Sequence, residues 1–213
     1  MPSTVRITWA RGEEVTGRLA GDGPVGVLLA HGAGTDQDHP LIVAIRDGLA
    51  SRGLRVLTFN YPYTERGGKR PDPRARLLDC HRAAADRLGR SVDLLYMAGR
   101  SMGGRMGSYL VADGYPAAGL VFYSYPLHPA GRTDRLRVEQ FASIRVPMLF
   151  FQGTHDALAR MDLFEEHIAR LPGATVEIME GAAHSPGRGG WTVPRMADHL
   201  AGRTARWIQY SRP

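Results

Sequence analysis

Short apolar runs alternate with longer segments in which apolar residues recur every three or four positions. Continuous apolar runs predict strands of a parallel sheet that is covered on both faces. The longer periodic segments predict helices that turn one apolar face to such a sheet. Alternation of polar and apolar residues around a turn at residues 11–12 predicts an antiparallel hairpin over residues 5–9 and 14–19. The predicted strands cover residues 25–30, 55–60, 94–98, 119–123, 148–153 and 175–179. The predicted helices cover residues 40–51, 73–88, 138–144, 158–171 and 194–210, and a further helix follows residue 103, with Met106, Tyr109 and Leu110 on one face.

This order of elements predicts an α/β fold, with a mostly parallel central sheet flanked by helices on both faces. A chain of 213 residues with 43% apolar residues is long enough for one domain with a sizeable core. We therefore expect residues 1–213 to form a single domain.

The charge pattern does not indicate a nucleic-acid surface. The formal net charge is +6, but Lys69 is the only lysine and the arginines are scattered along the chain. No basic motif with interleaved aromatic residues accompanies them, so we expect no nucleic-acid partner. A polar stretch at residues 64–76 holds several of the arginines, and it can be read as a site for an acidic substrate or as a solvated loop.

The cysteine count and the hydropathy pattern bear on the cellular compartment. Cys80 is the only cysteine, so no disulfide can form within the chain and a reducing compartment is expected. No apolar run approaches the roughly 18 residues of a membrane span, and residues 1–10 lack the apolar core of a signal peptide. These features predict a cytoplasmic protein without a membrane partner.

The sequence Gly99-Arg100-Ser101-Met102-Gly103 lies between a predicted strand and a predicted helix. G-x-S-x-G alone is a weak signal in a chain with 26 glycines, where it can be a turn with a surface serine. Between a strand and a helix, however, it is typical of a nucleophile elbow, in which a sharp turn projects the serine above the sheet. Small residues two before and two after the serine let the strand and the helix approach each other. Ser101 is therefore the candidate nucleophile.

Loops at the carboxyl ends of the other strands offer candidate binding residues. Ligands of open parallel sheets lie above this edge, so Tyr61, Tyr63 and Tyr125 are candidate walls of a substrate site. Packing of these tyrosines on neighbouring loops is the alternative. His31-Gly32-Ala33-Gly34 follows the strand at residues 25–30 and reads either as a tight turn or as a loop that folds over a ligand.

Together these features resemble the α/β-hydrolase family over residues 25–190. The resemblance implies that the backbone N–H groups of Met102 and Ala33 form an oxyanion hole, with Gly34 as the fallback. It also implies the chain order Ser, Asp, His for a catalytic triad, which selects Asp156 after the strand at 148–153 and His184 after the last strand. Asp156 can alternatively be a helix N-cap.

The 24 residues between Tyr123 and Met148, where lids of this superfamily are usually inserted, hold at most a short helix. The chain thus resembles small lidless, dienelactone-hydrolase-like proteins, although it carries Ser101 where a true dienelactone hydrolase carries cysteine. Three segments, at residues 61–64, 99–105 and 125–129, resemble more closely the bacterial relatives of the testis-expressed and chromatin-complex hydrolase-like proteins.

The resemblance implies a serine hydrolase for small carboxylic esters, with thioesters or activated amides as further substrates. Neither a metal nor an organic cofactor is expected. The open site implies a preference for short acyl groups. Two alternatives use the same fold: a binding scaffold without turnover, and a cofactor-free acyltransferase or peroxidase. The oligomeric state does not follow from the sequence.

Overall fold

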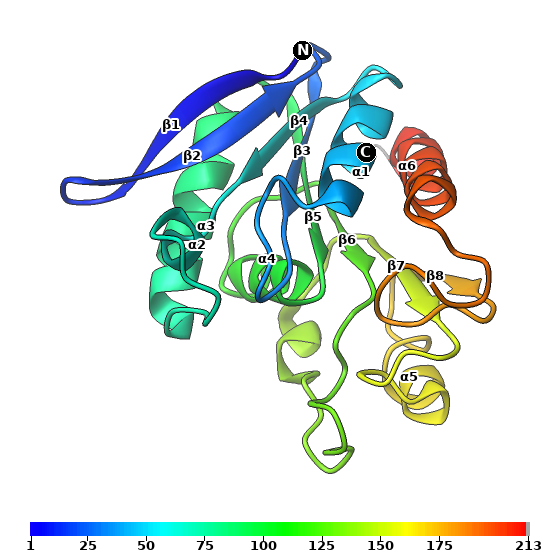
Figure 1. The fold of residues 1–213 in the computed structure, drawn as a ribbon. Coiled ribbons are helices and arrows are strands. Elements are labelled where there is room, and N and C mark those ends of the chain that lie inside the picture. Colours follow the sequence, from blue (N-terminus) through cyan, green and yellow to red (C-terminus); the bar gives the residue numbers. More distant parts are fainter. Residues whose placement is uncertain (212–213) are drawn as a thin grey trace.

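A computed structural model describes residues 1–211, which fold around one eight-stranded sheet with the order β1-β2-β4-β3-β5-β6-β7-β8 (Figure 1). The antiparallel hairpin of β1 and β2 lies at one edge and pairs antiparallel with β4, whereas the remaining strands are parallel. The fold is thus the expected α/β-hydrolase arrangement. Its strands are β1 (Ser3–Ala10), β2 (Glu13–Ala20), β3 (Val25–Ala30), β4 (Arg55–Phe59), β5 (Leu94–Arg100), β6 (Gly119–Tyr123), β7 (Met148–Gly153) and β8 (Ala174–Met179).

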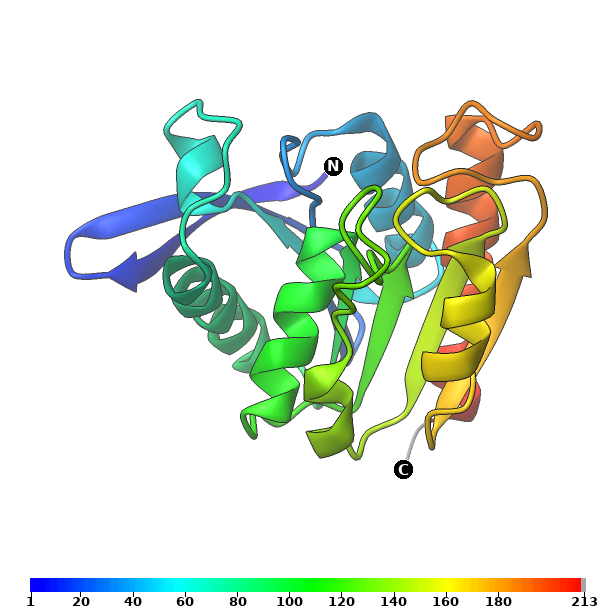
Figure 2. The same cartoon turned by 90° about the horizontal axis from the view of Figure 1, so that it is seen from below.

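Helices cover both faces of this sheet (Figure 2). One face packs on α1 and α6 and the other on α3, α4, η1 and α5, so the sheet separates two apolar cores. β3 and β7 are buried along their whole length, as their continuous apolar sequences predict, whereas the edge strand β8 is largely half-buried or exposed. The helices are α1 (Pro40–Ala50), α2 (Pro62–Glu65), α3 (Arg74–Gly89), α4 (Met102–Ala112), the 3₁₀ helix η1 (Glu139–Ser143), α5 (Met161–His167) and α6 (Val193–Tyr210).

Two helices differ from the sequence prediction. The short helix α2 was not predicted, because four residues cannot display a helical period. α5 is shorter than the predicted helix at 158–171. Its start is delayed because the Asp156 carboxylate accepts a hydrogen bond from the Leu158 N–H and holds a turn there, so the helix begins only after Arg160.

No insertion covers the carboxyl edge of the sheet. Between β6 and β7 the chain forms only loops and the five-residue η1, so the fold has no substantial lid. Within residues 1–211, no helix combines the length and the apolar character that crossing a membrane requires.

Candidate active site

Ser101 occupies the sharp turn between β5 and α4. Its φ of 50° lies in the left-handed region, which a non-glycine residue adopts only under local strain. The flanking glycines permit this turn. A Cβ atom at Gly99 would lie 2.2 Å from the Gly104 nitrogen, and one at Gly103 would lie 2.5 Å from the Ala30 carbonyl oxygen. Only glycine fits at these two positions, which explains the spacing of the motif.

The structure brings Ser101, His184 and Asp156 into one hydrogen-bonded chain. The Ser101 Oγ lies 2.9 Å from His184 Nε2, and His184 Nδ1 lies 2.8 Å from Asp156 Oδ2. The Asp156 side chain is fully buried, whereas that of His184 is 21% exposed. A carboxylate at Nδ1 favours the tautomer with its proton there, which leaves Nε2 free to accept the serine proton.

Two further hydrogen bonds hold the Asp156 carboxylate. Gln152 Nε2 donates to Oδ2 over 2.9 Å, and the Leu158 N–H donates to Oδ1 over 2.8 Å. Asp156 therefore caps the turn before α5 and contacts His184 at the same time. The two sequence interpretations of this residue, as a cap and as a partner of the histidine, are compatible.

Arg100 contacts the His184 loop and was not singled out from the sequence. It is only 7% exposed, and its Nη2 donates to the His184 carbonyl oxygen at 3.1 Å and to Ser185 Oγ at 2.7 Å. Burial lowers the pKa of Arg100, while the charge of Asp156 acts in the opposite direction. The guanidinium thus ties the loop after β8 to the elbow. Its position next to Ser101 in the sequence is the signal that could have identified it.

The loop after β3 places Ala33 beside Ser101. Ala33 and Met102 both line the cavity in which Ser101 lies, and Met102 begins α4, where first-turn N–H groups lack helical acceptors. His31 supports this loop: its Nδ1 lies 2.8 Å from the Gly32 carbonyl oxygen, and its Nε2 accepts a hydrogen bond from the Tyr61 N–H. Burial lowers the pKa of His31 to about 4, so the ring is neutral at pH 7.

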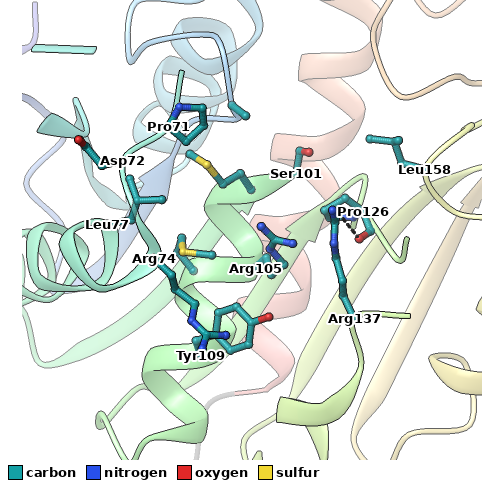
Figure 3. A pocket seen from close by; sticks show the side chains of 13 residues that line it. Pro71, Asp72, Arg74, Leu77, Ser101, Arg105, Tyr109, Pro126, Arg137 and Leu158 are labelled. Carbon is teal, nitrogen blue, oxygen red and sulfur yellow. Dashed lines mark hydrogen bonds between the residues drawn. The ribbon is translucent and has the colours of Figure 1, made fainter. Parts of the chain in front are cut away.

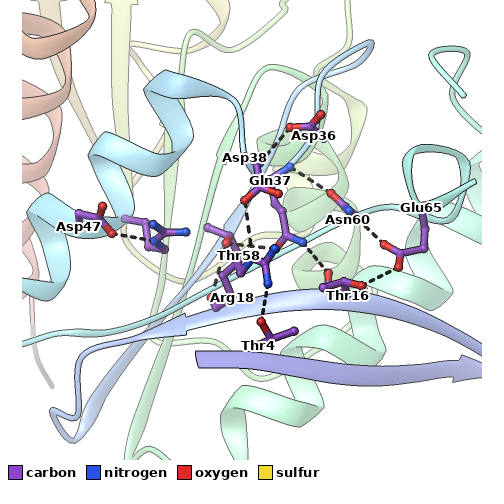
Figure 4. A network of polar contacts seen from close by, with 11 residues as sticks. Thr4, Thr16, Arg18, Asp36, Gln37, Asp38, Asp47, Thr58, Asn60 and Glu65 are labelled. Carbon is purple, nitrogen blue, oxygen red and sulfur yellow. Dashed lines mark hydrogen bonds and ion pairs between the residues drawn. The ribbon is translucent and has the colours of Figure 1, made fainter. Parts of the chain in front are cut away.

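A polar network anchors the outer part of the same loop (Figure 4). The Gln37 N–H donates to Asn60 Oδ1 at 3.1 Å, and Gln37 Nε2 donates to the Thr16 carbonyl oxygen at 3.0 Å. Glu65 on α2 accepts from both Asn60 Nδ2 and Thr16 Oγ1. The network therefore joins the loop to β2, to the end of β4 and to α2.

A cavity of about 500 Å³ opens beside Ser101 (Figure 3). One part of its lining is apolar and consists of Leu77, Met106 and Leu158, together with the Tyr109 ring. The other part is charged and was not predicted as a group. Its charged residues are Asp72, Arg74, Arg105 and Arg137.

The tyrosines predicted as walls of the site do not line this cavity. Tyr61, Tyr63 and Tyr125 are at most 2% exposed and belong to the core. Their hydroxyl groups have internal partners, because Tyr61 bonds to His81 Nδ1 at 2.8 Å and Tyr125 donates to the Arg137 carbonyl oxygen at 2.6 Å. The prediction is therefore corrected in favour of the alternative, packing inside the protein.

Gly34 is also absent from the cavity lining; with φ at +72° it forms the turn of the loop. Segment 64–76, in contrast, reaches the cavity through Pro71, Asp72 and Arg74.

The arrangement contains the parts of an acyl-transfer site. A strained serine lies at a helix N-terminus, an imidazole is within hydrogen-bond distance of it, and a buried carboxylate holds the imidazole. Such a constellation can form a covalent acyl intermediate without an additional cofactor.

Comparison with known proteins agrees with this architecture. A family model for the alpha/beta hydrolase domain matches residues 24–209. Among solved structures, an esterase from Pyrococcus furiosus is 15% identical, with a TM-score of 0.79 over 99% of this chain and 92% of that one. A dienelactone hydrolase from Anabaena variabilis is 19% identical, with a TM-score of 0.77 over 100% and 99% of the two chains. A serine hydrolase without a lid from Xanthomonas campestris is 18% identical, with a TM-score of 0.74 over 97% and 94%.

Proposed function

Because the chain belongs to the alpha/beta hydrolase domain family, we propose that it is a serine hydrolase that cleaves carboxylic esters through an acyl-enzyme. One observation carries the proposal: the hydrogen-bonded chain from Ser101 through His184 to Asp156, at a strained strand-to-helix turn. Thioesters and activated amides could react by the same route. A binding scaffold would not need this alignment of three side chains.

In the acylation step, His184 Nε2 accepts the proton of Ser101 as the Oγ attacks the ester carbonyl carbon. Asp156 stabilises the imidazolium that forms and keeps the ring oriented. The N–H groups of Met102 and Ala33 bind the oxyanion of the tetrahedral intermediate, which is where charge develops. His184 then gives its proton to the departing alkoxide.

In the deacylation step, water takes the place of the alcohol. His184 removes a proton from the water, which attacks the acyl carbon, and the proton returns to Ser101 Oγ when the acid leaves. Arg100 acts on both steps as a positioning residue, because it fixes the carbonyl of His184 and the neighbouring Ser185.

The open site favours short acyl groups. A buried methylene contributes about 0.8 kcal/mol only where it leaves water. The lining near Ser101 combines a few apolar side chains with guanidinium groups and offers no continuous apolar tunnel. We therefore expect kcat/KM for acetyl and butyryl esters to exceed that for chains of about ten carbons. With no lid to move, we expect no activation at a lipid surface.

A panel of p-nitrophenyl esters of graded acyl length tests this function. Wild type should hydrolyse the short members, and Ser101→Ala should reduce turnover by at least about 10³-fold, leaving what the oxyanion hole supplies. The exposed Ser51, which follows α1, provides a matched Ser51→Ala control that should retain full activity. Equal turnover in wild type and Ser101→Ala would refute the mechanism, and a folded wild type without turnover on any ester would favour the scaffold.

A further inference from the structure

Positive charge collects in the cavity beside Ser101. Arg74, Arg105 and Arg137 line it from three separate segments, namely the start of α3, α4 and the loop before η1 (Figure 3). None of the three forms a salt bridge within residues 1–211. Asp72 is the one acid of the lining. Its Oδ1 lies 2.7 Å from Arg66 and 3.9 Å from Arg76, whereas its Oδ2 is buried and has no hydrogen-bond partner within residues 1–211. The three arginines of the lining therefore outnumber this acid.

Among the three arginines, Arg105 is the one that lies on α4, the helix that begins directly after Ser101. It lies four residues after Ser101, on the same face of the helix and about 6 Å further along the axis. Its Nε is buried and has no hydrogen-bond partner in the described chain. Because the Arg105 side chain also lines the cavity, its terminal N–H groups can donate to a ligand there.

Arg137 supplies the second guanidinium. Its Nη1 donates to the Pro126 carbonyl oxygen at 3.2 Å, which fixes the side chain at the cavity and leaves other N–H groups available. Burial lowers the pKa of Arg137, and the charge of Arg105 lowers it further, whereas Glu139 has a smaller, opposite influence. Both guanidinium groups line the same cavity (Figure 3), so an anion bound there would be stabilised by two positive charges.

Arg74 lies at the exposed side of the cavity. Its guanidinium is 5.0 Å from the centre of the Tyr109 ring, and the Tyr109 hydroxyl donates to Glu139. Arg74 therefore adds positive potential at the entrance, while Arg105 and Arg137 form the inner pair.

The position of His184 decides which part of the substrate meets these arginines. In an acyl transfer the leaving alcohol receives its proton from the histidine, so it must lie on the side of His184. His184 is absent from the residues that line the cavity, whereas Ala33, Met102 and Ser101 are present. The cavity therefore accommodates the acyl part of the ester.

We propose that the substrate is a monoester of a short dicarboxylic acid, whose free carboxylate binds between Arg105 and Arg137 while its ester carbonyl lies at Ser101. This inference rests on the proposed hydrolase function and specifies its substrate class. Guanidinium groups bind planar carboxylates through paired hydrogen bonds. Because Ser101 and Arg105 are about one helical turn apart, we infer a short spacer of about two or three methylenes, as in succinyl or glutaryl esters. Hydrolysis adds water across the ester bond, so a dicarboxylate and an alcohol leave.

A pair of isosteric substrates tests the proposal. The p-nitrophenyl monoester of glutaric acid carries the carboxylate, and the corresponding ester of glutaramic acid replaces it with a neutral amide of nearly the same shape. Wild type should prefer the acid by at least about tenfold in kcat/KM, because an unpaired guanidinium discriminates against the amide. The preference should fall as ionic strength rises.

Variants of the cavity arginines test whether these residues cause the preference for the acid over the amide. Arg105→Gln and Arg137→Gln should each bring the ratio of kcat/KM for the acid to kcat/KM for the amide to within about threefold of unity. The matched control is Arg135→Gln, which removes an exposed arginine that lies 4.0 Å from Asp134 and does not line the cavity. The control should keep the wild-type preference. A wild-type preference near unity, or an equal loss in the control, overturns the proposal and leaves the hydrolase function standing.

A binding measurement tests the carboxylate site independently of ester hydrolysis. Glutaric acid monoanilide, an unreactive analogue, should bind Ser101→Ala at least about tenfold more tightly than glutaramic acid anilide in calorimetry. Adding Arg105→Gln should remove the difference. Equal binding of the two anilides refutes the carboxylate site whatever the catalytic result. Selective binding without ester turnover in wild type supports the site and refutes the hydrolase.

Discussion

His31 and His184 both lie beyond parallel strands at the carboxyl edge of the sheet, yet the main partners of their ring nitrogens differ. In His31 both nitrogens meet backbone groups, the Gly32 carbonyl oxygen and the Tyr61 N–H, and the ring is fully buried. The Thr64 hydroxyl lies 3.4 Å from its Nε2, farther than the Tyr61 nitrogen at 3.2 Å. In His184 one nitrogen meets the Asp156 carboxylate and the other meets the Ser101 hydroxyl.

The difference shows that partners, rather than location, determine what an imidazole can do. Burial lowers the pKa of His31 to about 4, which makes it a poor base, and its acceptor nitrogen is already occupied by an N–H that cannot react. His184 has a carboxylate that stabilises its charged form and a hydroxyl that can give up a proton. One histidine supports the loop of Ala33, and the other is the candidate base.

Replacing His184 or His31 by glutamine, one at a time, should give the largest difference in kcat between two variants. His184→Gln removes the base and should lower kcat for ester hydrolysis by about 10³-fold or more. His31→Gln should change kcat of the folded enzyme by less than about tenfold while lowering the free energy of unfolding by about 1–3 kcal/mol, since a buried hydrogen bond is disturbed. Steady-state kinetics and urea unfolding of both variants measure this. The comparison fails if His31→Gln is as inactive as His184→Gln.

Asp156→Asn should produce the next largest effect. The amide can accept at one atom only and favours the wrong tautomer of His184, so kcat should fall by about 10²-fold or more with a smaller change in KM. The Leu158 N–H can still bond to the amide oxygen, so the fold should persist. Circular dichroism provides the control, and an unchanged kcat in a folded Asp156→Asn would argue that Asp156 only caps the turn.

The buried His31 and His81 should make the free energy of unfolding sensitive to mild acid. Burial lowers the pKa of His31 to about 4 and that of His81 to about 3, both from 6.5. Between pH 6.5 and 4 the unfolded chain therefore binds more protons than the folded one. Above pH 6.5 these two histidines do not lower the free energy of unfolding. Below pH 6.5 that free energy falls as the pH drops, by at most about 1.4 kcal/mol per pH unit for each histidine. Urea unfolding from pH 7 to pH 4.5 measures this slope, and His31→Gln should reduce it; an identical slope in the variant would contradict the assignment.

Arg100 should have the smallest of these effects. Arg100→Lys retains the charge but cannot donate to the His184 carbonyl and Ser185 Oγ in the same geometry, so kcat should fall by about three- to tenfold at nearly constant KM. A change in KM alone would indicate that Arg100 contacts the substrate rather than the His184 loop.

The local patterns of the chain predict the sheet and the elbow well. Continuous apolar runs such as residues 25–30 are buried strands because both faces of a parallel sheet are covered. The motif around Ser101 predicts a sharp turn because Gly99 must lie against Gly104, a few residues ahead, although the restriction at Gly103 comes from the Ala30 carbonyl oxygen of β3. Features of this kind depend on neighbours in the sequence, and the sequence is sufficient to find them.

The boundaries of short helices and the walls of the cavity depend on distant contacts instead. The late start of α5 follows from what Asp156 binds, and the burial of Tyr61 follows from its bond to His81 on α3. Arg137 reaches the cavity through a loop whose path no periodicity describes. Arg105 is the exception, because its spacing of four from Ser101 on a helix indicates a shared face.

Covalent labelling with a fluorophosphonate probe tests the central claim, that His184 activates Ser101, most directly. The account predicts one equivalent of label on wild type, located at Ser101 by peptide mass spectrometry. His31→Gln should label at close to the wild-type rate, His184→Gln at least about a hundredfold more slowly, and Ser101→Ala not at all. Label at another residue, or wild-type labelling of a folded His184→Gln, would contradict the account.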